Sequence, residues 1–349
     1  MNVFYYCNRK FQNNCQKILI IGGYNQTLNI MLFKKRNLVI YLMMLPGLSA
    51  LAQTSYFGNT GTNIEMIEKF KKTTTLFTLP YSEYKEIEKY NEAIKKVWTI
   101  TPYKIIKPEE LATYQRSTDY SFFYLDSYRE QIDTINNLNL VYGLKVISPS
   151  IKPDKMEETT LATITLFPDA LTNLQMTFIE QSNTKKAARS KLLSLLYNQA
   201  VFLNWSPGLL SGYLKQINDG LLSNQARGLD YSFYNTKRLP KLINETLYVP
   251  EYVREVFSSQ TTPLTQETPA EEQYRYKLKF VSNKILDSLI LNKDSNIKYL
   301  VYTKRSNDKI ISIYDSTDGL LIYQIFSFQS PNFSMSDLNN IKKTIKLIQ

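Results

Sequence analysis

Acidic residues stand at the ends of two expected strands in the first half of the chain. Glu109 and Glu110 follow the segment Tyr103–Lys107, and Asp126 closes the segment Tyr120–Asp126. If these strands are parallel, their carboxyl ends meet at one edge of a sheet, where ligands usually bind. Carboxylates that converge there could act as the acid and base of a hydrolase or glycan-active enzyme. These three acidic residues are therefore the candidate catalytic residues.

A structural role also accounts for the same carboxylates. Glu109 and Glu110 lie at the start of an expected helix, where acidic side chains interact favourably with the helix dipole and cap free N–H groups. The corresponding edge of the second half carries Lys304, Arg305 and Asp308, so the acidic set is not repeated. An ancestral catalytic set should be complete in at least one copy. We therefore expect a non-enzymatic binding or structural module, with a carboxylate-dependent enzyme as the alternative.

Five further residues are candidates for ligand binding. Ser82 and Arg129 belong to the same expected sheet edge, and Tyr231, Tyr234 and Tyr252 could form platforms for sugars or peptides. Aromatic residues near strands more often fill the core or pair across strands. A third possible function is a receptor that holds a small ligand between the two halves, which predicts a deep pocket at their junction.

The composition excludes several chemistries. The chain has no histidine, and its two cysteines, Cys7 and Cys15, both precede residue 31. Residues 53–349 therefore cannot form a Ser-His-Asp or Cys-His catalytic group, a histidine-containing zinc site or a disulfide. The chain also lacks the glycine-rich patterns that cradle phosphate groups. We expect no metal and no cofactor.

The segment Met31–Ala52 has the order of a bacterial signal peptide. A basic head at Lys34–Arg36 precedes the apolar run Leu38–Leu48, and small residues flank Leu51 at the end. The apolar run is shorter than the ~20 residues of a membrane-spanning helix. We therefore expect export and cleavage, a periplasmic or secreted location, and no integral membrane span after cleavage. An uncleaved anchor is the alternative.

Removal of this leader changes the charge of the chain. The whole sequence has 42 basic and 31 acidic residues, and residues 1–52 contain six of the basic and none of the acidic ones. The remaining net charge of about +5 is ordinary for this length, so it does not indicate nucleic-acid binding. The expected partner is an envelope protein or a glycan, of unknown identity.

The residues after the leader form two halves with a similar order of expected elements. In each half a strand, a helix, a strand, a helix and a strand precede a hairpin and a final helix. Thr75–Pro80 (TLFTLP) matches Glu245–Pro250 (ETLYVP), and Tyr103–Lys107 (YKIIK) matches Tyr276–Phe280 (YKLKF). We expect an α/β fold (α+β is possible) of two related mixed-sheet units joined by a helical segment, and we interpret the likeness as an internal repeat.

Local signals mark several ends of these elements. Ser82 is the expected N-cap of a helix over 83–98, Ser334 and Asp337 form an expected capping box, and Ser316–Gly319 is a typical hairpin turn. The whole chain is then divided as follows: 1–30 an untranslated or disordered extension, 31–52 the signal peptide, 53–72 a lead, 73–203 the first α/β unit, 204–243 a helical connector, and 244–349 the second α/β unit, with 258–273 as a polar loop.

Overall fold

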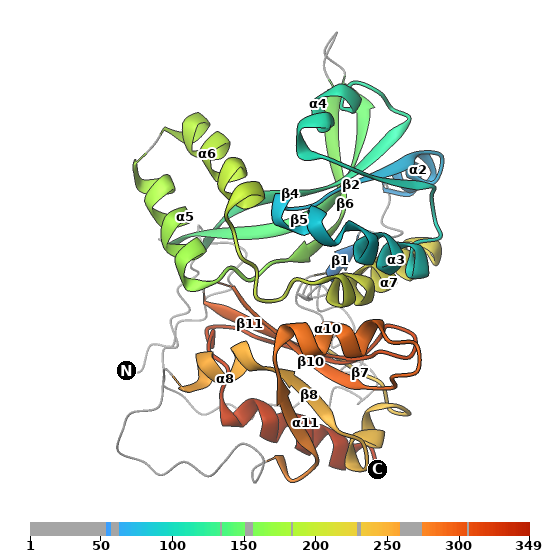
Figure 1. The fold of residues 1–349 in the computed structure, drawn as a ribbon, viewed down its shortest axis with the longest axis vertical. Helices are drawn as coiled ribbons and strands as arrows, with labels where there is room; N and C mark the ends of the chain where they lie inside the picture. Colours follow the sequence, from blue (N-terminus) through green and yellow to red (C-terminus); the bar gives the residue numbers. More distant parts are fainter. Residues whose placement is uncertain are drawn as a thin grey trace, which may run out of the picture. The chain divides into compact units, whose positions relative to one another are not determined.

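The structure, a computed structural model, describes two six-stranded mixed sheets with their helices (Figure 1). The expected extension 1–30, the signal segment 31–52 and Tyr231 lie outside the described residues, as does nearly all of the loop 258–273. The described ranges are 54–56, 63–132, 135–150, 156–182, 184–228, 232–258, 274–305 and 307–349.

The first sheet has the strand order β1-β6-β5-β4-β2-β3. The strand β2 pairs in parallel with β3 and β4, and the other neighbours are antiparallel. Threonine and aromatic residues dominate β2, and such residues fit a pleated, buried surface. The strand bounds are β1 Thr54–Tyr56, β2 Thr74–Thr78, β3 Tyr103–Ile106, β4 Tyr120–Ile132, β5 Ile135–Pro149 and β6 Met156–Thr165.

The second sheet repeats this topology. Its order is β7-β12-β11-β10-β8-β9, and β8 pairs in parallel with β9 and β10 while the others are antiparallel. Its bounds are β7 Phe233–Tyr234, β8 Leu247–Pro250, β9 Leu278–Val281, β10 Lys298–Arg305, β11 Asp308–Asp315 and β12 Leu320–Ser327. The expected α/β class and the two similar mixed-sheet units are thus confirmed.

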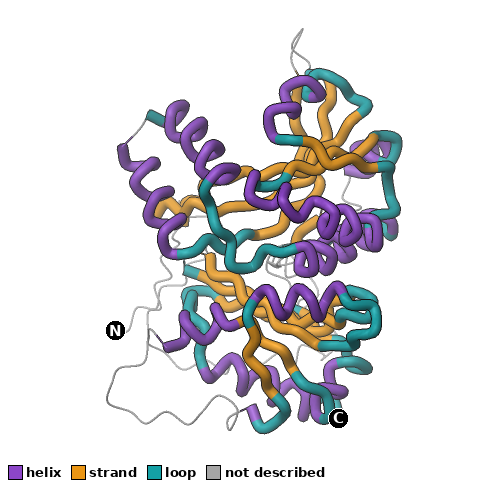
Figure 2. The backbone as a smooth tube through the Cα atoms, viewed as in Figure 1, coloured by secondary structure: helices purple, strands orange, loops and turns teal. Residues whose placement is uncertain are grey.

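Helices lie at corresponding places in the two units, and Figure 2 shows them flanking the strands. In the first unit they are α2 Asn63–Phe70, η1 Tyr81–Glu86, α3 Ile87–Val97, η2 Pro108–Glu110, α4 Leu111–Tyr114, α5 Ala170–Ser182 and α6 Lys185–Asn198. In the second unit they are η3 Leu239–Ile243, α8 Glu251–Ser258, α10 Asn283–Leu291 and α11 Met335–Leu347. No helix within the described ranges is both long and apolar enough to cross a bilayer.

The helix α7, Pro207–Leu222, lies in the expected helical connector. Ser206 caps it by accepting a hydrogen bond from the Leu209 N–H at 3.2 Å. It contacts α3 and β1 of the first unit and α10 and β12 of the second. Both of its faces are therefore buried, and the core around it contains side chains from both sheets, such as Phe123 of β4 and Tyr299 of β10.

Two smaller cores cover the outer faces of the sheets. In the second unit α11, α8 and η3 pack on alternate strand residues, including Leu300 and Tyr302. In the first unit Leu76 and Phe122 point to the face that α4 covers, whereas their neighbours Phe77 and Phe123 point to the central core. Successive strand residues therefore alternate between two cores in each unit.

A buried carboxylate joins α10 to the start of α7. The Gly208 N–H donates a hydrogen bond to Asp287 Oδ1 at 2.7 Å, and burial raises the pKa of Asp287 above its ordinary value. Hydrogen bonds from Ser206 and Gly208 act in the opposite direction. The free N–H groups of the α7 N-terminus thus hold this carboxylate in the core.

Several local expectations were wrong or incomplete. Ser82 is not an N-cap, because the helical segment begins at Tyr81, two residues earlier than expected, as the 3-10 turn η1, with Pro80 before it and no side-chain cap. The lead 53–72 contributes β1 to the first sheet, and the region 230–242 contains β7 and most of η3. The capping box of Ser334 and Asp337 and the turn at Gly319, which has φ +72°, are confirmed.

Candidate functional site

The two adjacent glutamates at the carboxyl edge of β3 have structural partners. Glu109 is exposed and accepts a hydrogen bond from the Tyr81 hydroxyl at 2.5 Å, which lowers the pKa of Glu109. Glu110 accepts from the Lys107 N–H at 2.7 Å and so caps the short helix η2. These contacts support the capping explanation for Glu110 and a structural role for Glu109.

The third candidate carboxylate belongs to a different cluster. Asp126 is a buried residue of β4 and forms an ion pair with Lys145 of the neighbouring β5. The Ser127 N–H donates to it at 2.8 Å, and Arg189 of α6 approaches it to 4.0 Å. Among the described residues, no direct contact joins Asp126 to Glu109 or Glu110.

The described ligand-binding candidates have different partners. Ser82 is exposed and donates to the carboxylate of Glu83, and Arg129 forms an ion pair with Glu180 of α5. Tyr234 is an exposed residue of the edge strand β7. Of the described members of this set, Tyr252 lines a pocket that also contains Lys304 and Arg305. The buried hydroxyl of Tyr252 donates to the Tyr302 carbonyl at 2.8 Å, so the side chain contributes its apolar ring to the pocket lining.

That pocket lies where residues of both units meet. Its volume is about 950 Å³, which is within the range of small-molecule sites. We call it the junction pocket; the first unit supplies Leu138, Asn139, Leu140, Thr165, Leu166, Phe167, Pro168, Asp169, Ala170, Leu171, Asn173 and Met176, and Leu203, Tyr252, Lys304 and Arg305 complete it.

A buried guanidinium forms the polar part of the junction pocket. The side chain of Arg305, at the end of β10, is only 2% exposed. Its Nη2 donates to Glu130 Oε2 at 2.6 Å and to the Tyr128 hydroxyl at 3.3 Å, and its Nε donates to Asn139 Oδ1 at 3.4 Å. Its Nη1 is buried and has no hydrogen-bond partner among the described residues. A buried polar group without a partner costs free energy, and such groups often mark the place of a water or an ion.

The rest of the pocket wall is largely apolar. Phe167 packs edge-on against Tyr252, with ring centroids 6.2 Å apart, and α5 contributes the buried Met176 and the exposed Leu171. The carboxylate of Asp169 accepts from the Thr172 N–H at 2.8 Å, so it caps α5. The charged residues of the lining are Lys304, Arg305 and Asp169, and Arg305 is paired with Glu130.

Arg305 was not among the candidate residues derived from the sequence. The signal that could have found it is the pair Lys304 and Arg305 at the end of the apolar strand β10, because two bases there must find partners. Its partners Asn139 and Glu130 are more than 160 residues away in the sequence. Only the folded chain shows that they meet.

The described part of the chain contains no group of three or more histidine, cysteine, aspartate or glutamate residues placed to hold a metal ion. Comparisons with protein-family models, with curated proteins and with solved structures find no match to this chain.

Proposed function

We propose that this protein is a binding protein whose junction pocket takes an organic anion with an apolar body. The proposal rests on two observations: Arg305 lines a pocket of about 950 Å³, and its Nη1 has no hydrogen-bond partner among the residues that the structure describes. A ligand oxyanion at this end of the pocket would give the free N–H its acceptor in a charge-assisted hydrogen bond. The apolar body would bury its surface against Phe167, Leu171 and Met176.

The construction of the pocket from both units supports a receptor rather than an enzyme. Residues of β5, β6 and α5 face residues of α8 and β10 across the pocket. A ligand there contacts two units at once and stabilises their packing by binding the folded state. The alternative of a carboxylate-dependent hydrolase has less support, because Glu109, Glu110 and Asp126 each have a structural partner.

The test uses two fluorescent probes that differ only in their anionic group. Anilinonaphthalene sulfonate carries a sulfonate on the apolar rings, and phenylnaphthylamine is the same molecule without it. We expect Arg305→Met to weaken binding of the sulfonate probe by about tenfold or more and to leave the neutral probe little changed. Equal losses for both probes would show that Arg305 only shapes the pocket, and no loss would overturn the proposal.

A second variant covers the case in which Arg305→Met fails to fold. Asn173→Asp adds a carboxylate to an exposed residue that lines the pocket in the first turns of α5, where it suits the helix dipole. We expect it to weaken the sulfonate probe alone, and more strongly at low salt. Asn292→Asp, on the exposed turn after α10, is the matched control and should change neither probe.

We also propose that the chain is exported. The basic head, apolar run and small terminal residues of Met31–Ala52 support this location. Expression with the native leader in a bacterium, followed by N-terminal sequencing of the periplasmic fraction, should give a protein that begins at Gln53. A cytosolic protein that still begins at Met1 would contradict export.

Finally, we propose that the two units descend from one duplicated unit. The support is the order of strands and of parallel and antiparallel pairs, which is the same in both sheets. The short shared phrases at Thr75–Pro80 and Glu245–Pro250 fall on corresponding strands, β2 and β8. Under this proposal the lining of the junction pocket comes from two copies of one ancestral unit. Neither copy alone then contains the whole pocket.

A further inference from the structure

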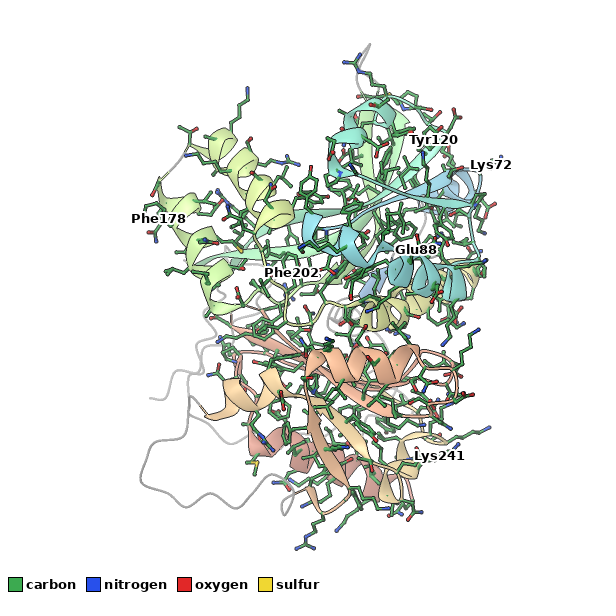
Figure 3. All side chains as sticks on the ribbon, in the orientation of Figure 1. Lys72, Glu88, Tyr120, Phe178, Phe202 and Lys241 are labelled. Carbon is green, nitrogen blue, oxygen red and sulfur yellow. The ribbon has the colours of Figure 1, made fainter. Side chains whose placement is uncertain are left out.

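A second surface, separate from the charged end of the junction pocket, exposes large apolar side chains. Leu171, Leu174 and Phe178 of α5 are 62%, 66% and 69% exposed. Their spacing of three and four residues places them on one stripe of the helix. Figure 3 shows Phe178 at the outer edge of the molecule, on the helix pair formed by α5 and α6. A contiguous exposed apolar stripe of this kind is typical of an interaction site.

The stripe borders a groove between the two helices. The α5–α6 groove has a volume of about 490 Å³. Leu174, Phe178 and Ile179 of α5 and Leu195 of α6 give it an apolar floor, and Gln175, Lys191, Ser194 and Gln199 give it polar edges. An amphipathic helix that lies in such a groove inserts side chains at positions i, i+3, i+4 and i+7. The groove therefore has the chemistry of a helix-binding site.

The charged residues of α5 and α6 indicate what kind of partner could bind the groove. All the charged residues of α6 are basic, namely Lys185, Lys186, Arg189 and Lys191. The single charged residue of α5, Glu180, forms an ion pair with Arg129 of β4. The groove edge that Lys191 forms is thus positive, and complementary charge favours a partner with acidic residues.

We infer that the α5–α6 groove docks an acidic amphipathic helix of another protein. A second copy of this chain is disfavoured, because Lys191 would form the groove edge in both copies and neither groove offers the other an acidic partner. A bilayer is disfavoured as well, because the amides of Gln175 and Gln199 would lose water without gaining partners there. A docked peptide helix instead offers polar side chains to these amides.

The test measures fluorescence anisotropy of a labelled synthetic helix with leucines at i, i+3, i+4 and i+7 and glutamates elsewhere. We expect saturable binding to the full chain and at least a tenfold loss in the double variant Leu174→Asp/Phe178→Asp. Both positions are exposed, so this variant should fold, and Leu347→Asp, at a residue of α11 that is 78% exposed, is the matched control. Lys191→Glu should weaken the acidic helix and improve binding of the same helix with lysines in place of glutamates.

Other outcomes would overturn this inference. If the lysine helix binds as tightly as the acidic helix, the groove does not select a partner by charge. If a scrambled acidic peptide binds as tightly, the groove does not recognise the helical spacing of the leucines. A dimer in sedimentation that Leu174→Asp/Phe178→Asp abolishes would identify a second copy as the occupant. Binding to phosphatidylglycerol vesicles that needs the same two residues would identify a membrane. Arg305→Met should not affect the acidic helix, so this test and that of the junction pocket can fail independently.

Discussion

Asp337→Ala is expected to lower the free energy of unfolding by about 3–5 kcal/mol, because it leaves a buried ammonium group without its carboxylate. The side chains of Lys309 and Asp337 are 2% and 4% exposed, and Lys309 Nζ lies 2.7 Å from Asp337 Oδ2. Asp337 also accepts from the Ser334 N–H at 2.7 Å, so the variant loses the capping box of α11. Urea unfolding followed by circular dichroism measures the change.

An exposed ion pair provides the matched control for this prediction. Lys69 Nζ and Glu65 Oε1 on α2 are 2.8 Å apart, a similar distance, but these side chains are 51% and 77% exposed, so Glu65→Ala should leave the unfolding free energy nearly unchanged. The double variant Lys309→Met/Asp337→Leu should recover part of the loss, since no charge remains buried. If Asp337→Ala costs no more than Glu65→Ala, the buried pair does not stabilise the second unit.

Gly220→Ala is expected to destabilise the protein by about 1–3 kcal/mol through overpacking. A Cβ atom at Gly220 of α7 would lie 2.1 Å from Cε2 of Tyr56, a buried residue of β1. The ring must therefore move, and with it the strand β1, which pairs with β6 and forms a bridge to Arg227. Alanine favours a helix over glycine by about 1 kcal/mol, and the expected loss already includes this gain.

Thermal and urea unfolding of two variants would test this contact. Gly143→Ala in β5 is the matched control, because its nearest contacts would be ordinary ones, at 3.8 Å to Lys145 Cε and 3.9 Å to the Ala162 carbonyl. The double variant Gly220→Ala/Tyr56→Ala should lose less than the sum of its single changes, because the second change removes the clash. A fully stable Gly220→Ala protein would contradict the close approach of α7 and β1.

Much of the fold follows from local sequence patterns. The apolar spacing of Leu209, Tyr213 and Ile217 places α7, and all three side chains are buried. The hairpin of β11 and β12 follows from the glycine at 319, which adopts positive φ. These features are predictable because the residues that determine them lie close together in the sequence.

The missed elements depend on distant partners. The strands β1 and β7 have only three and two residues, too few to show alternation, and each exists through pairing with β6 or β12. The helix α5 was not expected, and its exposed Leu174 and Phe178 do not follow the pattern of a helix that buries its apolar face. The partners of the acidic candidates, such as Tyr81 and Lys145, also depend on the fold, because spacing alone cannot identify them.

The measurement that most directly tests the proposed function is a crystal structure of the full chain with anilinonaphthalene sulfonate. We expect the rings of the probe against Phe167 and Met176, and a sulfonate oxygen within about 2.7–3.2 Å of Arg305 Nη1. A probe bound in the α5–α6 groove alone, or one that leaves Nη1 unpaired and turns its sulfonate to solvent, would contradict an anion site in the junction pocket.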